Sequence, residues 1–141
     1  MKKNSSLYNL PEKAPLKEMI TRSLVNIYRG NSADSSNLMF LELSKATAGN
    51  YRDKTFAKIH KSRVEHPETQ QIVEDLKLEN YKIISEKEVK CEWVISAHIL
   101  HLHHIHSKNL RFKAVFKFTP AKDRWLIEAG EVIPVFREEK A

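Results

Sequence analysis

The chain has 141 residues, of which 41% are hydrophobic, and its 24 Lys and Arg exceed its 18 Asp and Glu by six, giving a pI near 9.4. This length predicts one domain, and the composition argues against gross disorder and a Gly-rich phosphate loop. No run approaches the roughly 18 apolar residues that a membrane-spanning helix needs. The basic residues interleave with acids along the chain, which argues against a nucleic-acid interface. The single cysteine, Cys91, lies in an apolar pattern and is interpreted as a small buried residue.

The first segment, residues 1–14, is polar and is expected to form a flexible N-terminal arm, on which Leu7 could still dock. Pro15 then begins a helix, because its missing N–H costs nothing at the first helical position. Gly30-Asn31 is a suitable end for this helix. Its apolar residues recur at helical spacing and form one stripe: Leu16, Met19, Ile20, Leu24, Ile27 and Tyr28.

Two more helices are predicted before the strands begin. The second starts from N-cap candidates at positions 34–36 and ends near Gly49. Five of the six residues 38–43 are apolar, which indicates burial on more than one side. The third runs from about Tyr51 to Pro67. Its outward row of cations is interpreted as a solvated face: Arg52, Lys54, Lys58, Lys61 and Arg63.

Beyond Ile72 the apolar residues alternate, as in β-strands, and the phase of the alternation slips near Glu79-Asn80, which predicts a bulge. About four antiparallel strands are expected, joined by short polar turns. The turns are placed at Ser85–Glu88, Ser107–Asn109 and Pro120–Arg124, and the last strand is placed at Trp125–Ile133.

Segregated helices and strands predict an α+β protein. The expected fold is a cystatin-like or NTF2-like roll, in which three N-terminal helices pack on a bent antiparallel sheet of about four strands. The roll is placed at residues 15–136 as a single domain, followed by a charged tail at 137–141. Such rolls enclose a cavity between sheet and helices, and many of them pair into homodimers, so a protein partner or a small ligand in the cavity is expected.

The stretch from Cys91 to Ala114 holds five of the seven histidines and is the main candidate site. If one strand continues through it, its odd positions form the core face up to Ile99, and His101 and His103 extend that face toward the open end of the roll. On this assumption His104 and His106 lie on the opposite face.

A pair of histidines at His-x-His spacing in a strand lies about 7 Å apart, which lets one ion bind both rings. The hypothesis is a zinc-type site at His101 and His103, for which a third ligand, Glu128 or Glu131, would come from the last strand. Two alternatives stay open: a structural polar layer within the sheet, and a partner or dimer surface.

Several motifs resemble an uncharacterised bacterial domain family with the strand pattern C-x-W-x-V…H-W-G-H-x-H-x-R-x-N-x-Y-x-A, followed by W-K-[IL]. The matching segments here are Cys91-x-Trp93-Val94, His101-x-x-His104-Ile105-His106 and Trp125-Leu126-Ile127. The family's Trp-Gly is Leu102-His103 here, its Arg is Lys108 and its Asn is Leu110. The resemblance implies a soluble domain associated with membrane proteins on the outer side of the cytoplasmic membrane, and it implies no catalytic residue.

The sequence therefore favours a non-catalytic binding or assembly module, NTF2-like and dimeric, over an enzyme. The alternative is a metal-binding protein or hydrolase that uses the His-x-His pairs. The compartment stays open between the cytoplasm and the extracytoplasmic part of a membrane-associated system. The expected partner or ligand surface consists of His101, His103, His104, His106, Trp93 and Lys108.

Overall fold

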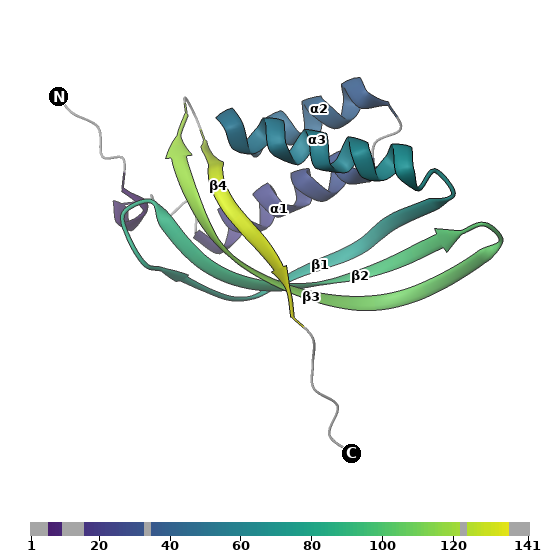
Figure 1. Ribbon diagram of the computed structural model, residues 1–141. Coiled ribbons are helices and arrows are strands. Elements are labelled where there is room, and N and C mark those ends of the chain that lie inside the picture. The colour runs from purple at the N-terminus through teal and green to yellow at the C-terminus, as the bar shows by residue number, and fades with distance from the viewer. Residues whose placement is uncertain (1–5, 10–15, 33–34, 122–123, 136–141) are drawn as a thin grey trace, which may run out of the picture.

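The computed structural model describes residues 6–9, 16–32, 35–121 and 124–135. Within these residues, a 3-10 turn (Leu7–Asn9) is followed by helices α1 (Leu16–Ser32), α2 (Ser36–Ser44) and α3 (Gly49–Glu65), and then by strands β1 (Thr69–Ile83), β2 (Glu88–His101), β3 (His104–Pro120) and β4 (Trp125–Pro134). The helices gather on one side of a strongly bent sheet (Figure 1). This arrangement confirms the predicted α+β roll.

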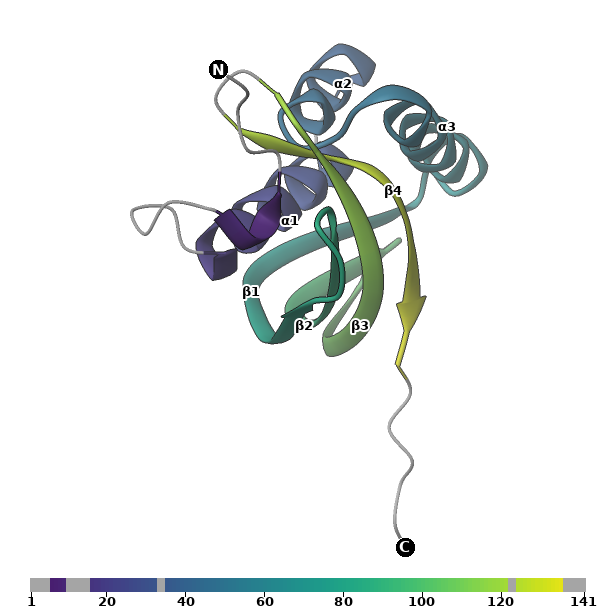
Figure 2. The same ribbon diagram turned by 90° about the vertical axis from the view of Figure 1, so that its left-hand side faces the viewer.

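The sheet is antiparallel with the order β1-β2-β3-β4, so that β1 and β4 form its edges (Figure 2). The bulge predicted near Glu79-Asn80 is confirmed by a register shift between Leu78 and Asn80. Two further shifts were not predicted, one between Val73 and Asp75 and one opposite Lys117/Phe118. Bulges bend a strand and increase its twist, which fits a sheet that curves around α1.

The core lies between α1 and the concave face of the sheet. Ile20 and Leu24 of α1 and Trp93 of β2 are at most 1% exposed. The Trp93 ring lies 5.9 Å from the Phe116 ring, and its indole N–H donates a 3.0 Å hydrogen bond to the Tyr28 hydroxyl. Burial of each large apolar side chain contributes roughly 1.5–3 kcal/mol. The predicted stripe of the first helix is therefore what the sheet wraps.

The described part of the expected N-terminal arm, residues 6–9, contacts this body. Leu7 is only 2% exposed, and its backbone N–H donates a 2.7 Å hydrogen bond to the Glu86 carbonyl. Pro15, the expected first helical residue, lies outside the described residues, as do the other residues of the arm and the tail from 136 onward.

The second helix differs from its prediction in extent and burial. Ser35 is the N-cap and accepts a 3.2 Å hydrogen bond from the Leu38 backbone N–H, as predicted. The helix ends at Ser44, however, and Gly49, expected as its stop, begins α3 with a φ of +58°. The prediction of burial on several sides is wrong, because Leu38 and Leu41 are 51% and 57% exposed. Of the described residues of α2, Met39 and Leu43 are the buried ones.

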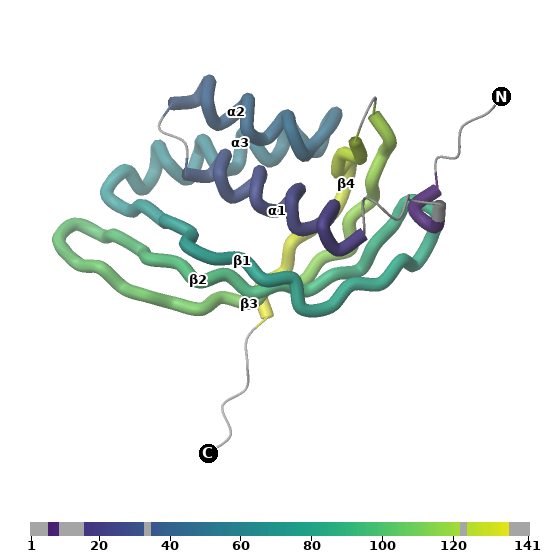
Figure 3. The backbone as a smooth tube through the Cα atoms, turned by 180° about the vertical axis from the view of Figure 1, so that it is seen from behind, coloured from purple at the N-terminus to yellow at the C-terminus, as the bar shows by residue number. Residues whose placement is uncertain are grey.

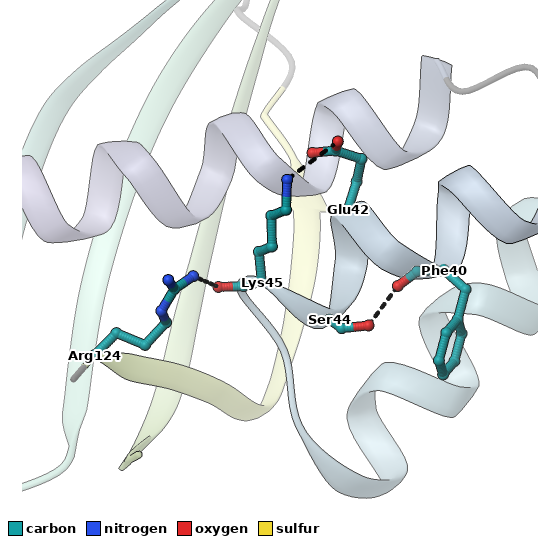
Figure 4. A network of polar contacts seen from close by, with 5 residues as sticks. All are labelled: Phe40, Glu42, Ser44, Lys45 and Arg124. Carbon is teal, nitrogen blue, oxygen red and sulfur yellow. Dashed lines mark hydrogen bonds and ion pairs between the residues drawn. The ribbon is translucent and has the colours of Figure 1, made fainter. Parts of the chain in front are cut away.

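The early end of α2 has a cause in β4. Backbone hydrogen bonds join Ile127 to Ala46 (2.7 Å) and to Ala48 (2.9 Å), so residues 46–48 pair briefly with the edge of β4. Arg124 adds a 3.1 Å hydrogen bond to the Lys45 carbonyl (Figure 4). The segment between α2 and α3 therefore covers an edge strand whose unpaired backbone groups would otherwise need other partners.

The predicted turn at Ser107–Asn109 is wrong. The β2–β3 turn lies at Leu102-His103, and His101 pairs with His104. Ser107 and Asn109 lie inside β3, where their side chains hydrogen-bond across the sheet to His98 (2.9 Å) and Ser96 (3.0 Å). Polar residues that suggested a turn thus satisfy one another on the outer face of a long hairpin.

Candidate functional site

The distal part of the β2–β3 hairpin is the candidate site, and residues 96–109 are called the hairpin extension. β2 and β3 continue together past the end of α1 and close in a narrow turn (Figure 3). All residues from His101 to Asn109 are exposed. The extension is anchored to β1, because the Leu102 N–H donates to the Glu68 carbonyl and β1 pairs with β2 as far as His101.

The turn at Leu102-His103 decides which histidines share a face. In β2 the odd positions, such as Trp93, face the helices, whereas in β3 the even positions, such as Phe116, do so. Since side chains alternate along each strand and directly paired residues share a face, the helix-facing side of the extension follows from the register. It carries Ile99, His101, His104, His106 and Lys108.

The predicted division of the histidines is therefore wrong. His101 and His103 do not form a His-x-His pair on one strand face, because His103 lies in the turn. His104 and His106, expected opposite to His101, lie on its face. The assumption of one continuous strand failed because the two-residue turn at Leu102-His103 leaves no break in the alternation of side chains along the sequence, although it reverses the chain.

Hydrogen bonds distinguish the histidines further. His98, on the outer face, is held at both nitrogens, by Ser107 at Nδ1 (2.9 Å) and by Glu74 at Nε2 (2.7 Å). His101 has its Nδ1 2.8 Å from the Thr69 hydroxyl. The rings of His104 and His106 stack, with centroids 6.3 Å apart and planes 26° apart.

The two acidic residues expected as a third metal ligand lie far from these rings. Glu131 pairs with Val115, and Glu128 makes a 3.3 Å ion pair with Lys117. Val115 is eleven residues from His104 along β3, roughly 36 Å of strand. Neither Glu128 nor Glu131 can join a site at the turn, so that part of the prediction is wrong. As their side chains are placed, the described residues contain no group of three His, Cys, Asp or Glu arranged around a metal ion.

Trp93 was expected at a binding surface, and this is also wrong, because it is 1% exposed and belongs to the core. Burial raises the pKa of its hydrogen-bond partner Tyr28 to about 12, which opposes any role for that tyrosine as a base. Burial, with a smaller contribution from Glu92, likewise raises the pKa of Cys91 to about 12.

Lys108 is exposed on the helix-facing side, two positions beyond His106. It carries the single formal charge of residues 96–109 at pH 7, in a chain with 30% charged residues. Thr69 and Glu74, which orient His101 and His98, were missed by the sequence analysis. Both lie in β1, and nothing local in the sequence assigns them to these histidines.

Among the described residues, two of the hollows lie at the rim of the roll. One, of about 540 Å³, is bounded by α1, α2 and the bulged part of β1, and includes Tyr28, Leu38 and Glu42. The other, of about 450 Å³, lies where the ends of α1 and α3 meet the start of β1, and includes Arg63 and Ile99.

Neither the known protein families nor the curated proteins contain a match to this sequence. No helix within the described ranges is long and apolar enough to cross a membrane. The resemblance to a family with an H-W-G-H-x-H strand stays an expectation.

Solved structures do match the fold. The chain is similar to the intermembrane-space region of the chloroplast protein ARC6 (TM-score 0.57, 11% identity, covering 84% of this chain and 97% of that one). It is also similar to a TrwG component of the type IV secretion system from Bartonella birtlesii (TM-score 0.55, 9% identity, covering 96% of this chain and 99% of that one). A third similar structure is CagV, a VirB8 homologue from Helicobacter pylori (TM-score 0.53, 10% identity, covering 83% of this chain and 95% of that one). At these identities the likeness concerns the fold, and the chain has the NTF2-like α+β roll that it shares with the secretion-system domains.

Proposed function

We propose that the chain is a non-catalytic assembly module that pairs with a second copy of itself through the hairpin extension. The observation that carries this proposal is the charge pattern of the extension. Residues 96–109 are held in two paired strands, are exposed over most of their length and carry one formal charge. Interface cores are depleted in charged residues relative to the rest of the protein surface.

Apolar side chains at the tip support the same proposal. Leu102 and Ile105 are 66% and 65% exposed, and Ile105 pairs with Leu100 on the outer face. Neighbouring Ile72 of β1 is 39% exposed. Exposed apolar side chains gathered on one end of a hairpin favour a protein partner. A two-fold axis through this face would bring two uncharged surfaces together without like-charge repulsion.

The proposed setting is a membrane-associated assembly, in which this domain is a soluble part. It is supported by the similarity of the fold to TrwG and CagV, which are components of type IV secretion systems. An extracytoplasmic location is the corresponding expectation. A small ligand at the 540 Å³ rim hollow would be an additional property of the module.

Light scattering after gel filtration tests the pairing. The wild-type chain is expected to run at about twice its 16.4 kDa mass. Ile105→Asp should run as a monomer, because a carboxylate buried without a partner costs several kcal/mol. Leu41→Asp is the matched control, since Leu41 is 57% exposed on α2, and it should remain dimeric.

Two results would contradict the proposal. A wild-type chain that is monomeric at about millimolar concentration excludes a useful homodimer, since its Kd would then be weaker than roughly 1 mM. A dimer that survives Ile105→Asp but is lost in Leu41→Asp places the interface on the helices instead.

A further inference from the structure

We infer that His101, His104 and His106 form a three-imidazole site for a divalent transition-metal ion, with Zn²⁺ as the ion that fits best. This goes beyond the proposed assembly role and does not depend on a partner. The three residues share the helix-facing side of the hairpin extension, two on β3 and one on β2. Three imidazoles and an open fourth position form a known type of zinc site.

The backbone spacing suits one ion. His101 and His104 are directly paired, which places their β-carbons about 5 Å apart. His104 and His106 are two residues apart on one strand, about 7 Å, and the diagonal from His101 to His106 is about the same. The three rings therefore start from the corners of a compact triangle on a rigid hairpin.

The rings of His104 and His106 lie near one another. Two imidazoles on one tetrahedral ion with Zn–N bonds of about 2 Å have ring centroids roughly 5 Å apart. The rings of His104 and His106 have centroids 6.3 Å apart and nearly parallel planes. As placed in the structure, the three rings do not surround one point, so binding requires rotation of these side chains. Both residues are exposed, so their rotation meets no packed neighbours.

Thr69 orients the ring of His101, the third ligand. Its hydroxyl lies 2.8 Å from Nδ1 of His101. When Nδ1 donates to this hydroxyl, the lone pair is on Nε2, which is then the ligand nitrogen. Metal-binding histidines are commonly oriented in this way by a partner at the other ring nitrogen.

The remaining two histidines of the segment are excluded by their contacts and place. Both nitrogens of His98 are occupied, by Ser107 and Glu74, on the outer face. His103 lies in the turn. These two residues therefore provide matched controls within the same hairpin. Lys108 lies on the site's face and its positive charge opposes a cation, so we expect micromolar rather than nanomolar affinity.

The test is calorimetric titration of the untagged full chain with Zn²⁺, together with Co²⁺ titration followed by visible absorption. One ion per chain and a tetrahedral Co²⁺ spectrum are expected. His101→Ala, His104→Ala and His106→Ala should each weaken Zn²⁺ binding at least tenfold, whereas His98→Ala and His103→Ala should change it less than twofold. Thr69→Val should weaken it about tenfold without removing a ligand, and Lys108→Gln should strengthen it several-fold.

Thermal melts monitored by circular dichroism establish that each variant is folded. If His104→Ala is unfolded, His104→Gln replaces it in the binding measurement. A Kd weaker than about 100 μM would overturn the site. Equal loss in His103→Ala and His104→Ala would overturn it too, because binding would then follow histidine content and not the shared face. Gel filtration with EDTA and with Zn²⁺ separates this result from the oligomeric state.

Discussion

Tyr28→Phe tests how much the hydrogen bond between Trp93 of β2 and Tyr28 of α1 stabilises the fold. The substitution removes the hydroxyl that accepts a 3.0 Å hydrogen bond from the Trp93 indole N–H and leaves the ring in place. Trp93 is 1% exposed, so its N–H would lose its partner inside the core. An unsatisfied buried donor costs about 1–3 kcal/mol, which we expect as the loss of unfolding free energy at pH 7.

The stability deficit of this variant should shrink at alkaline pH. Burial raises the pKa of Tyr28 from 10 to about 12 in the folded chain. Because the folded pKa is the higher one, the unfolded chain releases this proton first. The stability that Tyr28 contributes is complete below pH 10 and is lost as the pH rises through 12. The loss is roughly 1.4 kcal/mol at pH 11 and nearly 3 kcal/mol above pH 12. The phenylalanine variant has no such loss.

The assay is urea unfolding followed by tryptophan fluorescence at pH 7, 10 and 11. The deficit of Tyr28→Phe should shrink by about 1.4 kcal/mol between pH 7 and pH 11. Tyr81→Phe is the control, because Tyr81 is 43% exposed, and it should stay within about 0.5 kcal/mol of the wild type at pH 7. A Tyr28→Phe variant as stable as the wild type at pH 7, or a deficit that does not change with pH, would refute this account of the core.

Three further substitutions or reactions test the hairpin and the core. Leu102 has a φ of +57°, a left-handed conformation that is strained for leucine, and is 66% exposed. Leu102→Gly should relieve this strain and raise the free energy of unfolding by about 1 kcal/mol. A lower melting temperature of the variant would contradict this. Gly130 has a φ of +155°, and an added β-carbon would lie 2.6 Å from the Phe116 ring. Gly130→Ala should therefore lower the free energy of unfolding, measured in urea, by about 1–3 kcal/mol. In the control Gly49→Ala no atom lies within 4 Å of the added β-carbon, so only the backbone strain should lower the free energy of unfolding. Cys91 is 1% exposed with a pKa raised to about 12, so its thiol should react with a chromogenic disulfide reagent at pH 8 only after unfolding, and rapid reaction of the folded chain would be evidence against its burial.

The sequence alone was enough for the fold class. The apolar stripe of the first helix, the change to strand alternation after the third helix and the slip near Glu79-Asn80 all follow from local periodicity, which burial on one face imposes. These features predicted three helices on a bent antiparallel sheet, as the structure shows. The N-cap at Ser35 is likewise a local signal.

Local pattern could not place features that depend on distant partners. Gly49 looked like a helix stop, but the earlier end of α2 is set by pairing of residues 46–48 with Ile127, nearly eighty residues away. The apolar residues of α2 predicted burial, whereas only the packing of the helices determines that Leu38 and Leu41 face outward.

The histidines illustrate the same division most clearly. The sequence identified residues 101–106 as the candidate site, because their composition is unusual. It could not decide which of them share a face, since moving the turn from Ser107–Asn109 to Leu102-His103 places His104 and His106 on the face of His101 instead of the opposite one. The register of β2 with β1 and β3, which long-range pairing and the core around Trp93 fix, determines which histidines share a face. It brings His101, His104 and His106 together and removes His103, Glu128 and Glu131 from the site.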